Sequence, residues 1–479
     1  MAYSLICEDT MSGQITISLW VFLILVLIAT IAILDRILIP STRWFLRRRI
    51  NRVIDEIGTR LDIEIRPFQL TKRQVLIDRL AYDPSVLEAI KDFAKDHDIP
   101  IQVVQNKAMT YAREIVPSFN AYLYFRIGYW VAKKIARMLY RVRVGLVKER
   151  HYATIDPEST VVFVMNHRSN MDYVLVAFLA AERTTLSYAV GEWARIWPLQ
   201  MLIRAMGAFF VRRNSGNPLY RCVLKRYIHM ATREGVCQAV FLEGGLSRDG
   251  YLQDPKLGLV DYMLREFDPY TDRDIVFIPV GINYDRTIED RSLLRALKPG
   301  AVKRSWWFVC RTTGTFILHS LVLMVLSRWR RYGYACVNFG TPLSIKTYCK
   351  SRAVDFKKLD RSRRFPEVEK LCRQIMGTVA DVIPILPISL VSTVFLENHD
   401  MEMDILEVEK RSFQLIDRLK DKGAPIFESP RSTRVHAIAD AIDLMLLRGM
   451  ITTNSDGFKT SPEEMELLSY YANAIKHWL

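Results

Sequence analysis

The sequence is poor in cysteine and lacks cysteine motifs. Its 479 residues contain seven cysteines, an odd number, and no two of them stand in a C-x-x-C spacing (Cys7, Cys222, Cys237, Cys310, Cys336, Cys349, Cys372). Zinc sites use closely spaced cysteine pairs, and disulfide frameworks are expected in short secreted chains with an even number of cysteines. The sequence therefore predicts neither of them and favours a reducing compartment.

Acidic residues are also in deficit. The 52 aspartates and glutamates stand against 67 lysines and arginines, which gives a formal net charge of +15 at pH 7. Such a chain is expected to meet an anionic partner, and charge alone does not choose between a membrane surface, a nucleic acid and a phosphorylated small molecule. Half of the residues are hydrophobic, which excludes a disordered chain. The length predicts two or three domains.

Basic residues are missing from the first fourteen positions, which instead carry Glu8 and Asp9. The next twenty residues, Ile15–Leu34, contain no charge and have about the length of a membrane-spanning helix. A cleaved signal peptide would begin with basic residues and have a shorter apolar run, so we expect an anchor that is retained. Arginines gather directly after it (Arg36, Arg43, Arg47, Arg48, Arg49). They predict an N-terminus outside, a single-pass topology with the rest of the chain in the cytoplasm, and contact with anionic membrane lipids.

Two later apolar stretches are too short to cross a bilayer. Thr312–Ser327 is interrupted by Gly314 and His319, and Ile383–Leu396 contains two prolines. We expect each to be a core or membrane-surface element, so the sequence predicts one membrane span.

Residues 44–150 have the apolar spacing of helices. We expect helices over four segments (Asn51–Leu61, Thr71–Arg79, Ser85–His97, and about Gln105 through Leu146). A helical bundle packed on the core is the simpler interpretation, and a direct role in binding lipid or protein partners stays open.

Residues 151–400 alternate short apolar runs with helical stretches. The predicted strands are Val161–Met165, Leu186–Val190, Ala208–Val211, Ala239–Leu242, Ile275–Val280 and Tyr334–Phe339. This alternation predicts an α/β domain with helices on the faces of a sheet. Ligands of such sheets bind where the strands end, and polar turns follow several of these strands.

Residues 401–479 turn polar and helical again. We expect helices over Met403–Lys422 and His436–Arg448, then a hairpin over Ile451–Thr460 that turns at Asn454–Gly457. The run Ser461-Pro462-Glu463-Glu464 has the cap, the proline and the capping-box glutamate of a helix start. This small C-terminal helical module has a winged-helix-like order, and a packing or regulatory role is favoured over DNA binding.

A histidine and a carboxylate follow the first predicted strand in the turn Asn166–Asp172. Histidine titrates near neutral pH and suits a base that takes a proton from an attacking hydroxyl. A carboxylate on its other ring nitrogen fixes the tautomer and stabilises the imidazolium. The same H-x-x-x-x-D spacing occurs at His151/Asp156 and His399/Asp404, but neither of these pairs follows a strand. His167 and Asp172 are therefore the candidate base and its orienting acid, against the alternative of a polar turn that only satisfies backbone groups.

Arginines and a glycine turn follow two later strands. A guanidinium grips phosphate through two parallel hydrogen bonds, so Arg212 and Arg213 are candidate phosphate ligands, against the alternative of a solvated basic turn. Gly244 and Gly245 let the backbone approach a ligand closely. Beside them Glu243 can accept from a polyol hydroxyl, and Ser247 with Arg248 can donate to phosphate, unless this is an ordinary turn that closes a strand.

Four spaced blocks together resemble the glycerolipid acyltransferase superfamily, most closely the bacterial membrane-bound glycerol-3-phosphate acyltransferases. The blocks lie within residues 60–400 and begin at Asn166, Gly207, Phe241 and Ile278. The resemblance implies a mixed-sheet acyltransferase core flanked by helices. Within the matched blocks it also makes Arg168, Ser169 and Lys256 candidates for substrate binding. In the family an arginine usually stands where this chain has Leu246, so one expected phosphate contact is missing.

The resemblance implies a membrane-anchored O-acyltransferase of the bacterial inner membrane. It would move a fatty acyl group from acyl-CoA or acyl-ACP to the sn-1 hydroxyl of glycerol 3-phosphate, giving lysophosphatidic acid for phospholipid synthesis. No metal or other cofactor is implied. The implied partners are the acyl thioester donor, with acyl carrier protein as one form of it, and a phosphorylated polyol acceptor, while nucleic acid is not expected. Leu246 leaves open an enzyme for lysophosphatidic acid or dihydroxyacetone phosphate, and a catalytically lapsed lipid-binding membrane protein.

Overall fold

The computed structural model describes residues 66–121, 123–146, 152, 155–180, 185–191, 199–212, 215–298, 332–428, 434–454 and 457–479. All of them belong to one compact unit, Ile63–Leu479. The predicted anchor 15–34, the predicted helix Asn51–Leu61 and the stretch Thr312–Ser327 lie outside these residues. No helix among the described residues combines the length and the apolarity that crossing a bilayer requires.

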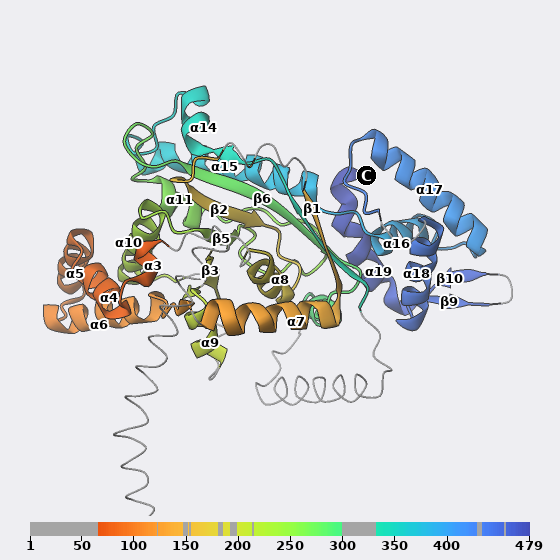
Figure 1. Cartoon of the computed structure of the whole chain (residues 1–479), viewed down its shortest axis with the longest axis horizontal. Coiled ribbons are helices and arrows are strands. Elements are labelled where there is room, and N and C mark those ends of the chain that lie inside the picture. Colours follow the sequence, from red (N-terminus) through yellow and green to blue (C-terminus); the bar gives the residue numbers. More distant parts are fainter. Residues whose placement is uncertain are drawn as a thin grey trace, which may run out of the picture. The chain divides into compact units, whose positions relative to one another are not determined.

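A mixed eight-stranded sheet flanked by helices forms the centre of this unit (Figure 1). The strands run in the order β1-β7-β6-β2-β5-β3-β4, and β8 pairs with β6. Their bounds are β1 Arg141–Leu146, β2 Thr160–Met165, β3 Ser187–Val190, β4 Phe209–Phe210, β5 Gln238–Phe241, β6 Ile275–Tyr284, β7 Tyr334–Phe339 and β8 Leu343–Ser344. β7 and β8 are antiparallel to β6, and the other pairs are parallel. The predicted α/β sheet is therefore confirmed, with all six predicted strands in place.

The register of the central strands brings the polar turns to one edge. Met165, the last residue of β2, pairs with Phe241, the last residue of β5, and with Val280 of β6. The turns that follow β2 and β5 therefore leave the sheet side by side. β6 continues to Tyr284, so its last residues run past the turn after β2.

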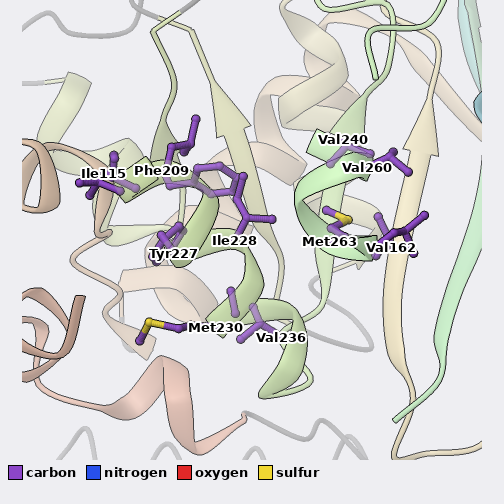
Figure 2. Close-up of a cluster of buried hydrophobic side chains, with 14 of the residues drawn as sticks. Ile115, Val162, Phe209, Tyr227, Ile228, Met230, Val236, Val240, Val260 and Met263 are labelled. Carbon is purple, nitrogen blue, oxygen red and sulfur yellow. The ribbon is translucent and has the colours of Figure 1, made fainter. Parts of the chain in front are cut away.

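Alternate residues of the central strands face two different hydrophobic cores. Val162, Val164 and Val240 belong to a core with α10 (Pro218–Arg233), α11 (Gly258–Leu264) and α15 (Arg361–Val382), part of which Figure 2 shows. Met165 and Ala239 belong to a second core on the other side, with α7 (Tyr129–Leu139) and α8 (Met171–Ala180). Burial on both faces explains why these strands are apolar throughout.

The N-terminal helices pack on the first of these cores. They are α3 (Pro67–Leu70), α4 (Arg73–Ala81), α5 (Pro84–His97) and α6 (Ile101–Ile115), and their buried side chains join those of α10. The helices predicted over 71–79 and 85–97 are confirmed as α4 and α5 to within two residues at either end. These helices form a bundle that packs on the core, as predicted from the sequence.

The prediction of one long helix from Gln105 to Leu146 is wrong. Val116 is extended, with φ −63° and ψ 122°, because Pro117 disfavours helical geometry in the residue before it. A π-helical segment, Leu123–Gly128, leads into α7, and Arg141–Leu146 forms β1 beside β7. In that last segment valines alternate with arginines, which is the period of a strand and not of a helix.

The C-terminal region is helical and has its own core. α16 (Pro387–Glu397), α17 (Ile405–Asp421), α18 (Arg434–Leu447) and α19 (Met465–Ala472) share this core with side chains of β7. α16 corresponds to the short apolar stretch 383–396, and its almost complete burial makes that stretch a core element. The predicted hairpin is confirmed as β9 (Ile451–Thr453) and β10 (Phe458–Thr460), which are antiparallel.

The last helix differs in one detail from the prediction. Ser461 makes no side-chain cap bond, and Pro462–Glu464 forms a short 3₁₀ turn before α19. Glu464 instead pairs with Arg291 at 2.6 Å, so the predicted capping box does not form. The predicted domain boundaries near residues 150 and 400 stay predictions.

Candidate functional site

His167 and Asp172 form a buried pair at the edge of the sheet. His167 Nδ1 lies 2.9 Å from Asp172 Oδ2, and both side chains are almost fully buried. The same oxygen accepts the backbone N–H groups of Arg168 and Ser169, at 2.7 and 3.0 Å. The other oxygen accepts the hydroxyl of Tyr284 at 2.6 Å. Four donors thus fix the carboxylate, which holds the Nδ1 side of the imidazole and leaves the Nε2 side for a substrate.

The backbone of His167 is held by the turn after β5. Its N–H donates to Glu243 Oε1 at 2.7 Å, and its carbonyl accepts from the N–H of Ser247 at 2.9 Å. The second oxygen of Glu243 accepts from the N–H of Gln253 at 3.0 Å. Burial raises the pKa of Glu243 to about 7, against the opposing effect of these two N–H donors. The Glu243 carboxylate therefore joins two backbone segments, at His167 and at Gln253.

Aromatic rings enclose the imidazole. The ring of Phe241 stacks on that of His167 with centroids 4.0 Å apart and 26° between the planes. Tyr173 meets His167 edge-on at 5.3 Å. These contacts fix the ring plane in an environment of low polarity, which strengthens the hydrogen bond to Asp172.

His167 lines a cavity of about 480 Å³. Its walls are largely apolar and aromatic, with side chains from β3, α10, α11 and the residues directly after β4 and β5 (Ala189, Val190, Val211, Tyr220, Leu224, Leu242, Leu259, Tyr262). Three basic side chains, Arg212, Arg221 and Lys256, also line it. No acidic side chain appears among the described residues of the lining. The cavity therefore suits an amphiphile with an apolar chain and an anionic group.

Arg212 lines the cavity but is already engaged. Its Nε and Nη2 donate to the two carboxylate oxygens of Glu114 at 2.9 and 2.6 Å. The guanidinium lies 5.2 Å from the ring centroids of both Tyr111 and Tyr220. The hydrogen bonds to Glu114 raise the pKa of Arg212. Any contact with a phosphate would use the N–H donors that Glu114 does not take up, and Arg213 lies outside the described residues.

Gly244 and Lys256 meet at the mouth of the cavity. Gly244 has φ +70°, and a Cβ there would lie 2.8 Å from Lys256 Cγ. The lysine stem therefore lies directly over the glycine, and the exposed ammonium can reach an anion in the cavity. The conformation of Gly244 and its surroundings both disfavour a side chain.

The remaining residues of that turn do not line the cavity. Ser247 donates its hydroxyl to the carbonyl of Tyr251 at 2.7 Å and so closes the loop, while Arg248 is exposed and Gly245 is partly buried. Leu246 packs against the C-terminal core. The Leu246 side chain, which stands where the family usually has an arginine, thus points toward apolar side chains of the C-terminal region.

Arg168 and Ser169 also face away from the cavity. Arg168 is buried, donates to the carbonyl of Gly250 at 2.7 Å and lies 4.8 Å from the ring centroid of Tyr470. Ser169 donates to Glu289 Oε2 at 2.7 Å. Both side chains tie the turn to other segments, and a role in binding substrate stays a prediction.

The alternative histidine pairs have no such setting. His151 lies outside the described residues. His399 is exposed and faces Asp400 at 3.1 Å, while Asp404 caps α17 through the N–H of Glu407. Within the described part of the chain, no three His, Cys, Asp or Glu side chains gather in a way that could hold a metal ion.

Several residues around the site were not among the predicted site residues. Tyr284 is the last residue of the fourth block, and its position at the end of a strand was a usable signal. Phe241 opens the third block and Tyr173 directly follows Asp172, whereas Glu114 and Glu289 carried no signal, because they reach the site only through the packing of distant segments.

Two family models match the chain. The model "Acyltransferase" covers residues 146–283, and "Glycerol-3-phosphate acyltransferase C-terminal region" covers residues 320–479. The first contains the pair and the residues that line the cavity, and the second contains most of the C-terminal core. The resemblance to the glycerolipid acyltransferases is therefore confirmed.

Curated relatives carry the name glycerol-3-phosphate acyltransferase. The protein of Aeromonas hydrophila is 29% identical over 434 residues, and those of Pseudoalteromonas atlantica and Haemophilus ducreyi are 27% identical over 424 and 435 residues. Each match covers 85% of this chain and 50% of the relative, so the chain spans about half the length of these relatives.

One solved structure is also similar, the 1-acyl-sn-glycerophosphate (LPA) acyltransferase PlsC of Thermotoga maritima. It is 16% identical with a TM-score of 0.28, and the match covers 52% of this chain and 80% of that one. This likeness is too distant to support a conclusion.

Proposed function

We propose that this protein transfers a fatty acyl group from a thioester donor to the sn-1 hydroxyl of glycerol 3-phosphate, giving lysophosphatidic acid. The observation that carries the proposal is the His167–Asp172 pair at the edge of a cavity with apolar walls and basic side chains. The names of the relatives support the acceptor, although the chain spans about half of their length.

The proposed reaction is a direct transfer. Nε2 of His167 takes the proton of the acceptor hydroxyl while Asp172, held by its four donors, stabilises the imidazolium that forms. The alkoxide attacks the thioester carbonyl, and the tetrahedral intermediate collapses with loss of the thiolate. The imidazolium then returns its proton to the thiolate, so the ester and the free thiol leave a neutral histidine behind.

The cavity supplies a place for each part of the substrates. Its apolar wall suits the acyl chain, and Lys256 and Arg221 suit the phosphate of the acceptor, with Arg212 held near them by Glu114. Coenzyme A and acyl carrier protein both present the same acyl thioester, and either satisfies this geometry.

A membrane setting would suit these amphiphilic substrates. The predicted anchor 15–34 would hold the site beside the cytoplasmic face of the inner membrane, where the donor arrives and the product can enter the bilayer. The arginines after the anchor would contact anionic headgroups.

Release of free thiol from acyl-CoA in the presence of glycerol 3-phosphate tests the proposal directly. We expect His167→Ala to abolish release, because the base is gone. His399→Ala is the matched control, since it changes an exposed histidine with the same spacing to an aspartate, and it should keep full activity. Full activity of His167→Ala would show that the base is another group.

A different acceptor is the second candidate, and Leu246 favours it. An arginine expected in this family is absent, and its replacement packs into the C-terminal core. Offering one labelled acyl-CoA with glycerol 3-phosphate, lysophosphatidic acid or dihydroxyacetone phosphate in turn separates these reactions. Labelled lipid bound without turnover across all donors and acceptors would instead point to a lapsed lipid-binding protein.

A further inference from the structure

The C-terminal region reaches the turn that carries His167. The ring of Tyr470 lies under the Arg168 guanidinium at 4.8 Å, and its backbone carbonyl packs against Gly250, where a Cβ would lie only 2.0 Å from the oxygen. Asn473 donates to the carbonyl of Asp249 at 2.9 Å. Residues more than two hundred positions apart thus share one contact surface beside the candidate base.

A buried cluster of Asp290, Arg448 and Tyr471 makes a second connection, and we name it the Asp290 cluster. Arg448 Nη2 lies 2.6 Å from Asp290 Oδ2, and the two side chains are 5% and 4% exposed. The Tyr471 hydroxyl donates to the same oxygen and accepts from Arg448 at 2.8 Å and from the N–H of Thr287 at 3.1 Å. A buried ion pair with its hydrogen bonds satisfied fixes the segment that carries it. The C-terminal region therefore determines where residues 287–290 lie.

Glu289, which precedes Asp290 in the chain, contacts the turn between His167 and Asp172. Its Oε2 accepts the hydroxyl of Ser169 at 2.7 Å, and its Oε1 accepts the backbone and side-chain N–H groups of Asn170 at 3.2 and 3.1 Å. These are the turn residues between His167 and Asp172, and they belong to no helix or strand. Their position depends on such side-chain bonds.

We propose that Glu289, fixed by the Asp290 cluster, is a positioning residue that holds the His167–Asp172 turn in its reactive geometry. This inference rests on the proposed acyl transfer. Glu289 does not line the cavity, so it acts on the turn and not on the substrate. The C-terminal region thereby contributes to the rate of the chemical step, because small displacements of a base reduce proton transfer strongly.

Three variants of the full-length chain test this role. Glu289→Ala removes all three bonds to the turn, and we expect kcat to fall about 10- to 100-fold with KM within about twofold. Glu289→Gln keeps an acceptor for Asn170 and should restore most of that loss. Glu466→Ala is the matched control, since Glu466 lies in α19 and pairs with Lys298 at 3.2 Å with both side chains 60% exposed, and its kcat should equal that of the wild type.

Deuterium uptake by the peptide that spans residues 166–172 gives a readout that needs no turnover. Uptake should rise in Glu289→Ala and, to a smaller extent, in Tyr471→Phe, which removes only the hydroxyl of the Asp290 cluster. It should not change in Glu466→Ala. The effects of Glu289→Ala and Ser169→Ala on kcat should be less than additive in the double variant, because each substitution removes the same hydrogen bond.

The results separate the two proposals. Folded Glu289→Ala protein with unchanged uptake in the turn and unchanged kcat would overturn the positioning role, as would a loss that appears only in KM. A wild-type protein that releases no thiol would instead refute acyl transfer, and the uptake experiment would then decide alone whether Glu289 holds the turn.

Discussion

Replacement of Asp172 by asparagine tests the geometry of the pair more finely than removal of the histidine. Asp172 Oδ2 accepts three donors, of which two are backbone N–H groups that cannot reverse. An asparagine must therefore place its carbonyl oxygen at this position and its amide nitrogen toward Tyr284. The His167 Nδ1–H still finds an acceptor, so the variant keeps the tautomer in which Nε2 is the base.

The magnitudes follow from what each variant loses. In the proposed reaction Asp172 stabilises the imidazolium that forms on proton transfer, so the loss falls on kcat. Removing one partner of a buried pair costs about 3–5 kcal/mol, which is about 10²- to 10⁴-fold in rate, and we expect this for Asp172→Ala. Asp172→Asn retains a neutral hydrogen bond worth about 1 kcal/mol, so its kcat should be about fivefold higher than that of the alanine variant.

Steady-state thiol release with acyl-CoA and glycerol 3-phosphate measures both values. KM should change little, because Asp172 does not line the cavity. Asp404→Asn is the control, since Asp404 has the same spacing to a histidine and only caps α17. An asparagine variant less active than the alanine variant would mean that the amide had turned its nitrogen to His167, and an unchanged kcat would refute the role of the carboxylate.

Three further predictions concern packing, pH and substrate binding. Gly281→Ala should lower the free energy of unfolding by about 1–3 kcal/mol, because its Cβ would lie 2.4 Å from the carbonyl oxygen of Val382. Gly377 lies in α15 with no atom near the position of a Cβ, so Gly377→Ala should raise the Tm, because alanine favours a helix more than glycine does. Burial raises the pKa of Asp285 from 3.8 to about 7. The folded state therefore holds this proton longer than the unfolded state, and the stability falls as the pH rises from about 4 to 7. Asp285→Asn stays neutral, so its Tm should exceed that of the wild type at pH 8 and match it at pH 4, and equal differences at both pH values would contradict this. Lys256→Gln should raise KM for glycerol 3-phosphate without changing the Tm, because the lysine is exposed, and an unchanged KM would remove it from the acceptor site.

Local patterns in the sequence were sufficient for most of the sheet and for the pair, but not for β1 and β8. Apolar runs that end in polar turns located six strands, and the histidine after the first strand was identified from that context. The pattern failed at Arg141–Leu146, where helical spacing was extended past Pro117 into a segment whose valines alternate with arginines.

The partners of the turn were beyond the reach of these patterns. Whether Glu243, Arg168 and Ser169 face a substrate or the protein depends on which segments pack beside them. In the structure they face His167, Tyr470 and Glu289, which lie 76, 302 and 120 positions away along the chain.

The sequence by itself determined six of the eight strands of the sheet, the pairing of His167 with Asp172 and the resemblance to the acyltransferases, because each depends on residues close together in the chain. Only the tertiary structure decided that Arg212 is held by Glu114, that Leu246 packs into the C-terminal core and that Glu289 holds the turn. These contacts join segments that meet only after the sheet and both sets of helices have packed. Side-chain direction there follows from burial and charge pairing in three dimensions, which no local spacing encodes.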